Sequence, residues 1–421
     1  MGPFITMVIL MALIGFITSI NQQFQAPMQA AFLQDAGDMT NTLTTFINFS
    51  FFLAYLIMGP TSARTLEKKG YKQALLVGIA LLVLALAFFE FSAIQYVKWP
   101  VTFNFGSIVL PLSYFIFIIG SFIAGTGLTY LQASVNPYIV ACDVKGTSGV
   151  QRQSIAGAGN SVMTTLGPLF IAFVVFGGAS GADIKVQSLF IPMVVLIAFV
   201  AILYFIVRRL NLPNLAGTSV AKDEKLSRSV WSFSHLSLGV IAIFMYVGVE
   251  VAVGSNINLY AIKDHGYTTG AAAQLASMYW FGMLIGRLCG SFISKISANT
   301  QLVFTTIGAG VLVTLSMFTG NPLLLVFVGL FHSIMWPAIF ALAIDKLGKY
   351  TAKGSGALMM GVVGGAVLPL IQGIFADSIG SWQWTWTIVV IGEVYLLYYA
   401  LVGHKVKQLP EDFDPNMNKV Q

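Results

Sequence analysis

The stretch GVIAIFMYVGVEVAVGSNINLY, residues 239–260, is long and apolar enough to cross a lipid bilayer as one helix, yet it carries a carboxylate, Glu250, near its centre. A charged side chain at that depth costs at least ~2.5–3.5 kcal/mol, so it persists where it faces a protein interior or a water-filled cavity. There it usually binds a substrate or a coupling ion. Glu250 is therefore a candidate functional residue, and the alternative is a structural hydrogen bond to a neighbouring helix.

The whole chain shares the composition of this stretch. Of its 421 residues, 57% are hydrophobic and only 9% are charged, whereas a soluble domain carries roughly 25% charged residues. Mean hydropathy is +0.82. Apolar runs of about 20 residues, the length of a membrane-spanning helix, recur at 5–33, 42–63, 74–95, 109–140, 151–177, 188–208, 236–262, 270–294, 301–319, 322–346, 355–377 and 384–403.

These runs predict an all-α polytopic membrane protein with twelve transmembrane helices in two six-helix bundles. Strict alternation of polar and apolar residues is absent, which argues against an outer-membrane barrel. Because no water competes for backbone hydrogen bonds in the hydrocarbon core, each run has to satisfy its backbone internally, as a helix.

The basic residues lie asymmetrically between the runs. If the chain crosses the membrane twelve times, 19 of the 22 Lys and Arg residues fall on one side, and Lys98, Lys185 and Lys263 fall on the other. Short cytoplasmic loops carry an excess of Lys and Arg. We therefore expect both termini in the cytoplasm and the protein in the cell (plasma) membrane, the inner membrane of a bacterium. The net charge of +6 reflects this bias and does not indicate a nucleic-acid partner.

One long polar stretch, NLPNLAGTSVAKDEKLSRSVWSFS at 211–234, divides the chain near its middle. Its Pro, Gly, Ser and mixed charges are typical of a linker. We expect an N-terminal six-helix bundle at 1–210, a cytoplasmic linker at 211–234, and a C-terminal bundle with a tail at 235–421.

A weak internal repeat supports this division. QASVNPYI at 132–139 aligns with HSIMWPAI at 332–339, and Pro168 aligns with Pro369 at nearly the same offset. Transporters built from two related halves show such repeats, with Pro- or Gly-interrupted helices lining a central site.

The first run contains an unusual polar cluster, NQQFQAPMQ at 21–29. Gln22, Gln25 and Gln29 share one helical face, and Gln23 lies beside Pro27 on another. Amide side chains both donate and accept hydrogen bonds, which suits neutral ligands rich in hydroxyl groups. The alternative is that these amides only hold helices together.

Further amides and aromatic residues occur in other runs. An apolar face for a sugar ring combined with amides for its hydroxyls is typical of a sugar site. The substrate-binding candidates expected to border one cavity are Gln23, Gln132, Asn136, Asn160, Asn258, His332, Trp336 and Gln372.

Three other charged residues in the runs have simpler interpretations. Glu393 has no second polar residue on its own helical face, which favours a structural or interfacial role. Arg287 and Lys295 fall near a predicted helix end, where long cations extend to the membrane surface.

The sequence offers no site for enzyme chemistry or for a cofactor. Cys142 and Cys289 fall near predicted cytoplasmic ends, where a disulfide is not expected, and no metal-ligand spacing occurs. The four His residues are scattered and no HExxH motif is present. We predict neither a catalytic residue nor a metal.

Several strings resemble a known family. The twelve runs, the central linker and a basic loop at 59–72 resemble the major facilitator superfamily. NPYIVA at 136–141, YVGVEVAVGS at 246–255, GLFHSIMWPAIFALAI at 329–344 and GGAVLPLIQG at 364–373 are similar to its fucose:proton symporter family, including the glucose/galactose permease branch.

This resemblance implies a sugar transporter that works by rocker-switch alternating access, usually as a proton symporter. Members of the family commonly carry an Asp in the first run and a Glu just before the Asn-Pro of the fourth, positions occupied here by Gln23 and Gln132. Because glutamine carries no titratable proton, the resemblance supports sugar transport better than proton coupling. Glu250 is then the remaining candidate for coupling, and His332 stands where relatives often have an amide.

The expected function is secondary active or facilitative transport of a small hexose-like sugar by a monomer, with a proton favoured over sodium as the coupling ion through Glu250. Two alternatives stay open: an uncoupled sugar uniporter, and a multidrug or metabolite exporter of the same fold. Fold by itself does not separate import from export.

Overall fold

Helices make up most of the chain. The computed structural model describes residues 2–141, 144, 149–179, 183–212, 228–290 and 296–410. The helices of the first half are α1 (Gly2–Gln23), α2 (Gln25–Phe32), η1 (Gly37–Met39), α3 (Thr40–Lys98), α4 (Leu112–Ala141), α5 (Gly149–Leu169), η2 (Phe170–Val175), η4 (Val186–Leu189) and α6 (Phe190–Arg209). Those of the second half are η5 (Val230–Ser232), α7 (Ser234–His265), α8 (Thr269–Gly290), α9 (Ala298–Thr319), α10 (Leu323–His332), α11 (Met335–Ile344), η7 (Gly348–Tyr350), α12 (Thr351–Met360), η8 (Gly361–Val363), α13 (Gly364–Ile379), η9 (Gln383–Trp386), α14 (Thr387–Tyr398) and η10 (Tyr399–Gly403).

These elements account for the twelve predicted runs. In the described part of the chain, 11 helical segments are long and apolar enough to cross a membrane. The twelfth is α8, a helix of 22 residues that includes Gln274 and Arg287. The long α3 contains two of the runs, which are separated at Gly70, where φ is 78°. The predicted all-α fold with twelve spans is confirmed.

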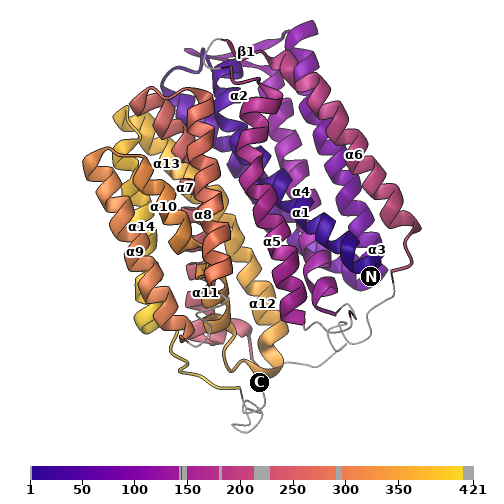
Figure 1. Ribbon diagram of the computed structural model, residues 1–421, viewed down its shortest axis with the longest axis vertical. Coiled ribbons are helices and arrows are strands. Elements are labelled where there is room, and N and C mark those ends of the chain that lie inside the picture. Colours follow the sequence, from indigo (N-terminus) through magenta and orange to yellow (C-terminus); the bar gives the residue numbers. More distant parts are fainter. Residues whose placement is uncertain are drawn as a thin grey trace.

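The helices form two bundles that lie side by side (Figure 1). The helices α1–α6 make one bundle and α7–α14 the other, with α5 and α8 at the seam. Glycines let neighbouring helices approach closely: Gly125 of α4 lies against the Phe51 carbonyl of α3, and Gly364 of α13 against the Phe244 carbonyl of α7. A Cβ atom at either position would collide with that carbonyl.

The domain boundaries predicted from the sequence stay predictions. Most of the 211–234 linker lies outside the described residues, so the structure does not trace the connection between 1–210 and 235–421. Cys142 and Lys295 also lie outside the described residues.

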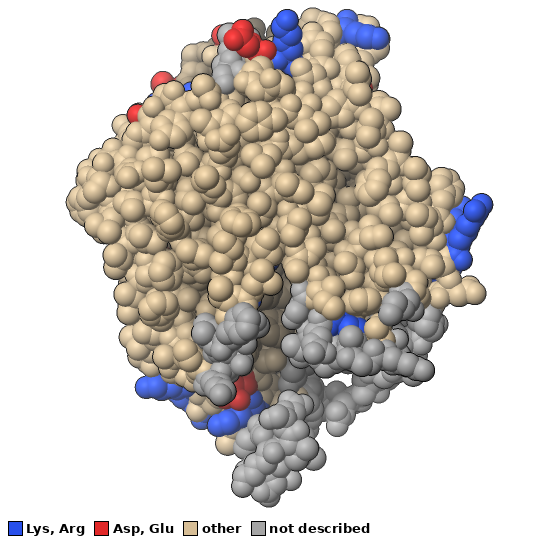
Figure 2. Space-filling model, viewed as in Figure 1, with Lys and Arg blue, Asp and Glu red and all other residues tan. Residues whose placement is uncertain are grey.

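A broad apolar band surrounds the molecule between its two ends. Figure 2 shows charged side chains at the top, the bottom and the right edge of this face, with a wide uncharged surface between them. Large apolar side chains on this surface are highly exposed; Ile191 is 78% exposed and Phe304 69%. Such an extended apolar surface fits a lipid environment rather than water.

A small hairpin interrupts the helical pattern between α3 and α4, at the end away from the N-terminus (Figure 1). Its strands are β1 (Thr102–Phe105) and β2 (Ile108–Pro111), which pair antiparallel across a two-residue turn. Gly106 in this turn has a φ of 66°, a conformation that glycine adopts readily. The fourth run, predicted at 109–140, therefore begins as a strand, and its helix begins at Leu112.

Hydrogen bonds join the two bundles at the same end, away from the termini. Asp377 in the last turns of α13 accepts from the backbone N–H groups of Asn41 (2.9 Å) and Thr42 (2.6 Å) in the first turn of α3. The Thr42 hydroxyl donates to the same carboxylate at 2.6 Å. A carboxylate at a helix N-terminus satisfies free N–H groups and complements the helix dipole. One bundle thus caps a helix of the other and closes this end.

Candidate binding cavity

A cavity lies between the two bundles, walled by α1, α3, α4 and α5 on one side and by α7 and α8 on the other. It holds about 600 Å³ of empty space, part of which is open solvent. The surface is hollowed toward the end that carries the termini (Figure 2). Its polar wall residues are Thr18, Gln22, Gln132, Asn160, Ser161, Thr164, Glu250 and Arg287, and its apolar ones include Phe52, Val247, Trp280 and Met283.

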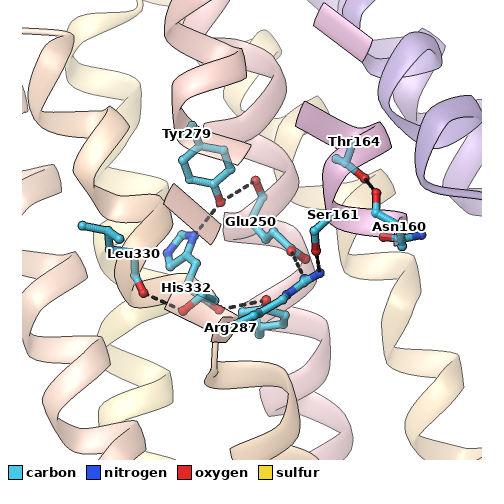
Figure 3. A network of polar contacts seen from close by, with 10 residues as sticks. Asn160, Ser161, Thr164, Glu250, Tyr279, Arg287, Leu330 and His332 are labelled. Atoms are coloured by element: carbon cyan, nitrogen blue, oxygen red, sulfur yellow. Dashed lines mark hydrogen bonds and ion pairs between the residues drawn. The ribbon is translucent and has the colours of Figure 1, made fainter. Parts of the chain in front are cut away.

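At the centre of the cavity wall lies an ion pair between α7 and α8, whose arginine also bonds to α5 across the seam (Figure 3). The Arg287 guanidinium on α8 lies 3.9 Å from Glu250 Oε1 on α7. Its other terminal nitrogen donates to Ser161 Oγ on α5 at 2.7 Å. The Arg287 side chain is 38% exposed and that of Glu250 15%. Solvent or a ligand can therefore reach both charges, and a ligand there would contact both bundles.

The interpretation of Arg287 as a cation that extends to the membrane surface is wrong. The guanidinium points into the cavity because a carboxylate on α7 and a hydroxyl on α5 both lie within its reach. The sequence did carry a signal: a cation within an apolar run needs a partner, and Glu250 was already singled out in the preceding run.

Two amides predicted from the sequence, Gln132 and Asn160, also line the cavity. Gln132 Nε2 donates to the Tyr55 hydroxyl at 3.1 Å, and Asn160 Nδ2 donates to the Met11 carbonyl of α1 at 3.0 Å. These bonds hold the two amide groups in place through their nitrogens. Neither bond uses the side-chain oxygen of Gln132 or of Asn160. An amide held in this way is ready to bind a polar ligand.

Gln23 and Asn258 lie where α1 meets α7, away from the termini. The Gln23 amide donates to the Gly254 carbonyl at 3.2 Å, and Asn258 Nδ2 donates to Gln23 Oε1. The structure therefore places them in a contact between the bundles. The neighbouring Gln22 is the amide of this cluster that lines the cavity, and its Oε1 is buried without a hydrogen-bond partner among the described residues.

The other predicted site residues are not among those that line the cavity. Asn136 donates to the Gln132 carbonyl one helical turn earlier, at 3.1 Å. Trp336 packs against Tyr246, with ring centroids 6.2 Å apart. Gln372 is fully buried, accepting from Asn256 at 2.8 Å and donating to Thr385 at 2.9 Å. The structure thus does not bring these three residues to the cavity wall.

His332 does not line the cavity either, and lies in a buried polar chain (Figure 3). Its Nδ1 lies 2.8 Å from the Tyr279 hydroxyl, which donates to the Glu250 carbonyl at 3.2 Å. Its Nε2 lies 2.8 Å from Glu393 Oε1. Glu393 was expected to lack a polar partner on its own helix, and its partner comes from α10 instead.

The described residues contain no group of three His, Cys, Asp or Glu side chains that could hold a metal ion. The predictions of no metal and no cofactor stay predictions. The chemistry that this cavity supports is recognition of a polar ligand by one carboxylate, one guanidinium and several amides and hydroxyls.

Comparison with known proteins agrees with this arrangement. The family model described as Major Facilitator Superfamily matches residues 11–362. A protein named glucose/galactose transporter from Brucella abortus is 30% identical over 399 residues, covering 93% of this chain and 91% of the relative. The L-fucose-proton symporter of Escherichia coli is 26% identical over 375 residues, covering 83% of this chain and 82% of the relative.

A solved structure shows the same fold. The crystal structure of the E. coli fucose:proton symporter superposes with a TM-score of 0.65 at 22% sequence identity, covering 94% of this chain and 97% of that one. At this identity the likeness establishes the fold, and the relatives above establish the family.

Proposed function

The chain belongs to the Major Facilitator Superfamily, and from this premise we propose that it transports a small, hexose-like sugar by alternating access. The observation that carries the proposal is the cavity between the bundles, in which a Glu250–Arg287 pair and the amides of Gln132 and Asn160 face the same space. The relative named as a glucose/galactose transporter supports the substrate class.

The cavity has the chemistry that a sugar needs. Carboxylate and guanidinium groups bind hydroxyls through charge-assisted hydrogen bonds, which are about twice as strong as neutral ones. The amides of Gln22, Gln132 and Asn160 add further donors and acceptors. Trp280 supplies an apolar face in the same wall, against which a sugar ring can stack.

Alternating access follows from where the bundles touch. Asp377 with α3 and Gln23 with α7 close the cavity on the side away from the termini. We propose that the termini lie in the cytoplasm of a cell whose plasma membrane holds the protein, so this form faces inward. Rocking of the 1–210 and 235–421 bundles against each other would then open the closed end and seal the other. We propose that the monomer is the transporting unit.

We further propose that sugar transport is coupled to protons through Glu250. Glu250 is the carboxylate among the described cavity residues, and Gln23 and Gln132 carry no titratable proton. An acid whose solvation changes as the cavity opens to alternate sides can bind a proton on one side and release it on the other. The relative that is a proton symporter supports this mode.

Uptake by proteoliposomes tests the proposal. A panel of radiolabelled sugars is offered with and without an inward proton gradient, and sugar exchange is measured at equal pH on both sides. A coupled importer accumulates a hexose only with the gradient, whereas a uniporter exchanges it and never accumulates it. Transport of none of the sugars, together with transport of a hydrophobic cation, would refute sugar transport in favour of export.

The matched variants are Glu250→Gln, which removes the titratable group in the cavity, and Glu90→Gln, which makes the same change in α3. If Glu250 couples, Glu250→Gln loses accumulation and keeps exchange at saturating sugar, because the glutamine amide still bonds to sugar hydroxyls. Glu90→Gln keeps both accumulation and exchange. Accumulation that persists in Glu250→Gln would remove Glu250 from coupling.

A further inference from the structure

A second acid–base pair lies outside the cavity, and the proposed sugar-binding function does not use it. His332 in α10 and Glu393 in α14 are 0% and 2% exposed, and His332 Nε2 lies 2.8 Å from Glu393 Oε1. The other carboxylate oxygen, Glu393 Oε2, is buried and has no hydrogen-bond partner among the described residues. A buried acid that is only half satisfied is costly to keep ionised.

We infer that His332 and Glu393 form a proton-binding site that takes up and releases one proton during the transport cycle and reports its state to the cavity through Tyr279. This inference rests on the proposed function, because it assigns a second residue set to proton-coupled sugar transport. It adds to Glu250 a site that no sugar can touch.

The hydrogen bonds of Tyr279 define two states of the pair. The Glu250 carbonyl can only accept, so when the Tyr279 hydroxyl donates to it, His332 Nδ1 has to donate to the Tyr279 oxygen. His332 then carries a hydrogen on Nδ1, and one further proton is shared between its Nε2 and Glu393 Oε1. In this state the pair as a whole is neutral.

In the other state the pair holds one proton fewer. His332 keeps a hydrogen only on Nε2, which donates to the Glu393 carboxylate, and its Nδ1 now accepts from the Tyr279 hydroxyl. The Tyr279 hydroxyl has one hydrogen, so its bond to the Glu250 carbonyl is lost. Release of one proton therefore reverses the hydrogen bond between Tyr279 and His332 and breaks the bond from Tyr279 to α7, and the pair acquires a net negative charge.

This exchange acts on a segment of α7 that faces both the cavity and the other bundle. The carbonyl that Tyr279 reaches belongs to Glu250, whose side chain lines the cavity. One turn later, the Gly254 carbonyl accepts from Gln23 of α1 at 3.2 Å. A change in the bonding of α7 at residue 250 can thus alter both the sugar site and the contact that closes the far end.

The groups facing the pair make the cavity side its route for protons. From α7 it meets Tyr246, whose hydroxyl donates to the His332 carbonyl at 3.0 Å, and beyond it Glu250; from α8 it meets Tyr279 and, farther off, Arg287. The helix α9, which packs on α14, has no titratable residue. On that side Glu393 borders an apolar groove lined mainly by aliphatic side chains of α9 and α14.

The groove offers few polar groups for conducting a proton. The hydroxyls of Thr306 and Thr314 line it, and both donate to carbonyls of their own helix, at 2.8 Å and 2.7 Å. Among its apolar members, Val311 and Val394 are 52% and 62% exposed. Among the described residues, the pair's polar contact on the cavity side is therefore Tyr279, which meets the His332 ring at 2.8 Å and the Glu250 carbonyl at 3.2 Å.

The test uses the full-length transporter in proteoliposomes and in detergent. Sugar exchange at equal pH, gradient-driven accumulation, and the protons taken up or released on sugar binding in weak buffer are measured for the wild type and for Glu393→Gln, His332→Gln and Tyr279→Phe. Glu90→Gln, the same change in an acid of the other bundle, is the control.

We expect Glu393→Gln and His332→Gln to keep exchange, to lose accumulation, and to bind sugar with a proton stoichiometry lowered relative to the wild type. Tyr279→Phe should also lose accumulation and bind sugar with a lowered proton stoichiometry, because the pair is then no longer linked to α7 and to the cavity. A purely structural pair would instead lower exchange and accumulation together and leave the proton stoichiometry unchanged.

The outcomes separate this inference from the proposed function. No sugar exchange by the wild type would refute the proposed function and the inference with it. Exchange by the wild type, combined with normal accumulation and stoichiometry in Glu393→Gln, would refute the inference alone. If Glu393→Gln does not fold, His332→Gln and Tyr279→Phe decide between the same two outcomes.

Discussion

The Glu250–Arg287 pair and the His332–Glu393 pair both lie in the second bundle, and they differ in how much solvent reaches them. In the first pair the nearest charged atoms are 3.9 Å apart and the side chains are 15% and 38% exposed. In the second pair the atoms are 2.8 Å apart, and the side chains of His332 and Glu393 are 0% and 2% exposed. The open pair also bonds to Ser161 of the other bundle, whereas the enclosed pair bonds within its own.

This difference indicates what each pair can respond to. A loose pair beside the cavity, with its nearest charged atoms 3.9 Å apart, can exchange its partner for a ligand hydroxyl more readily than a tight pair can. A tight enclosed pair has no room for a ligand, and only a proton or a change in packing can alter it. The open pair therefore suits sugar recognition and the enclosed pair suits proton storage.

The largest expected effect comes from removing one partner of the enclosed pair. His332→Leu leaves Glu393 buried without its partner, and breaking a buried pair in this way costs about 3–5 kcal/mol. The thermal unfolding midpoint in detergent should fall sharply, and the double variant His332→Leu/Glu393→Leu should recover much of it. Glu250→Gln, in the open pair, should lower the midpoint far less. An equal fall of the unfolding midpoint in His332→Leu and in Glu250→Gln would mean that the two pairs do not differ in burial.

For sugar affinity we expect the opposite ranking of the two pairs, with the open pair contributing more than the enclosed pair. Hydrogen bonds to charged groups contribute about 1.5–3 kcal/mol, so Arg287→Gln should weaken sugar binding by about ten- to a hundredfold. Glu393→Gln, at a pH where the enclosed pair holds its proton, should change affinity much less. Binding is measured by titration calorimetry, and a larger loss of affinity in Glu393→Gln would reverse our assignment of the two pairs.

Neutral amides beside the open pair should have a smaller effect than its charges. A neutral hydrogen bond contributes about 0.5–1.5 kcal/mol, so Gln132→Ala and Asn160→Ala should each weaken sugar binding by up to about tenfold. Gln372→Ala is the matched control, because its amide bonds are buried outside the cavity. It should lower stability and leave affinity intact. Unchanged affinity in both cavity variants, with folded protein, would exclude them from the site.

The smallest effect concerns the helix cap that Asp377 provides for α3 at the end away from the termini. This contact affects how firmly that end of the cavity stays closed, and it involves neither of the two pairs. Asp377→Asn weakens a helix cap, which contributes about 1 kcal/mol, and should increase opening of that end by about fivefold. A Thr45→Cys reporter, in a background without Cys142 and Cys289, lies buried where α3 meets α13. Its labelling by an impermeant thiol reagent should rise with Asp377→Asn. An unchanged labelling rate would mean that this cap does not hold the end closed.

The number and the length of the spans followed from the sequence, because the transfer free energies of the residues in a helix add up. Each residue contributes its own transfer free energy to a helix, so windows of about 20 residues report membrane spans without any knowledge of packing. The same reasoning found Glu250 as an acid at membrane depth, and it found the polar cluster around Gln22 and Gln23. It could not tell which of those two glutamines faces the cavity.

Residue pairing was decided only by the tertiary structure. His332 and Glu393 are 61 residues apart in the sequence, Arg287 and Ser161 are 126 apart, and Asp377 and Thr42 are 335 apart. Helical periodicity places a residue on a face of its own helix, but which other helix that face meets depends on how the helices pack. Glu393 therefore looked unpartnered and Arg287 looked like a surface cation until the packing of α5, α7, α8, α10 and α14 brought their partners within hydrogen-bonding distance.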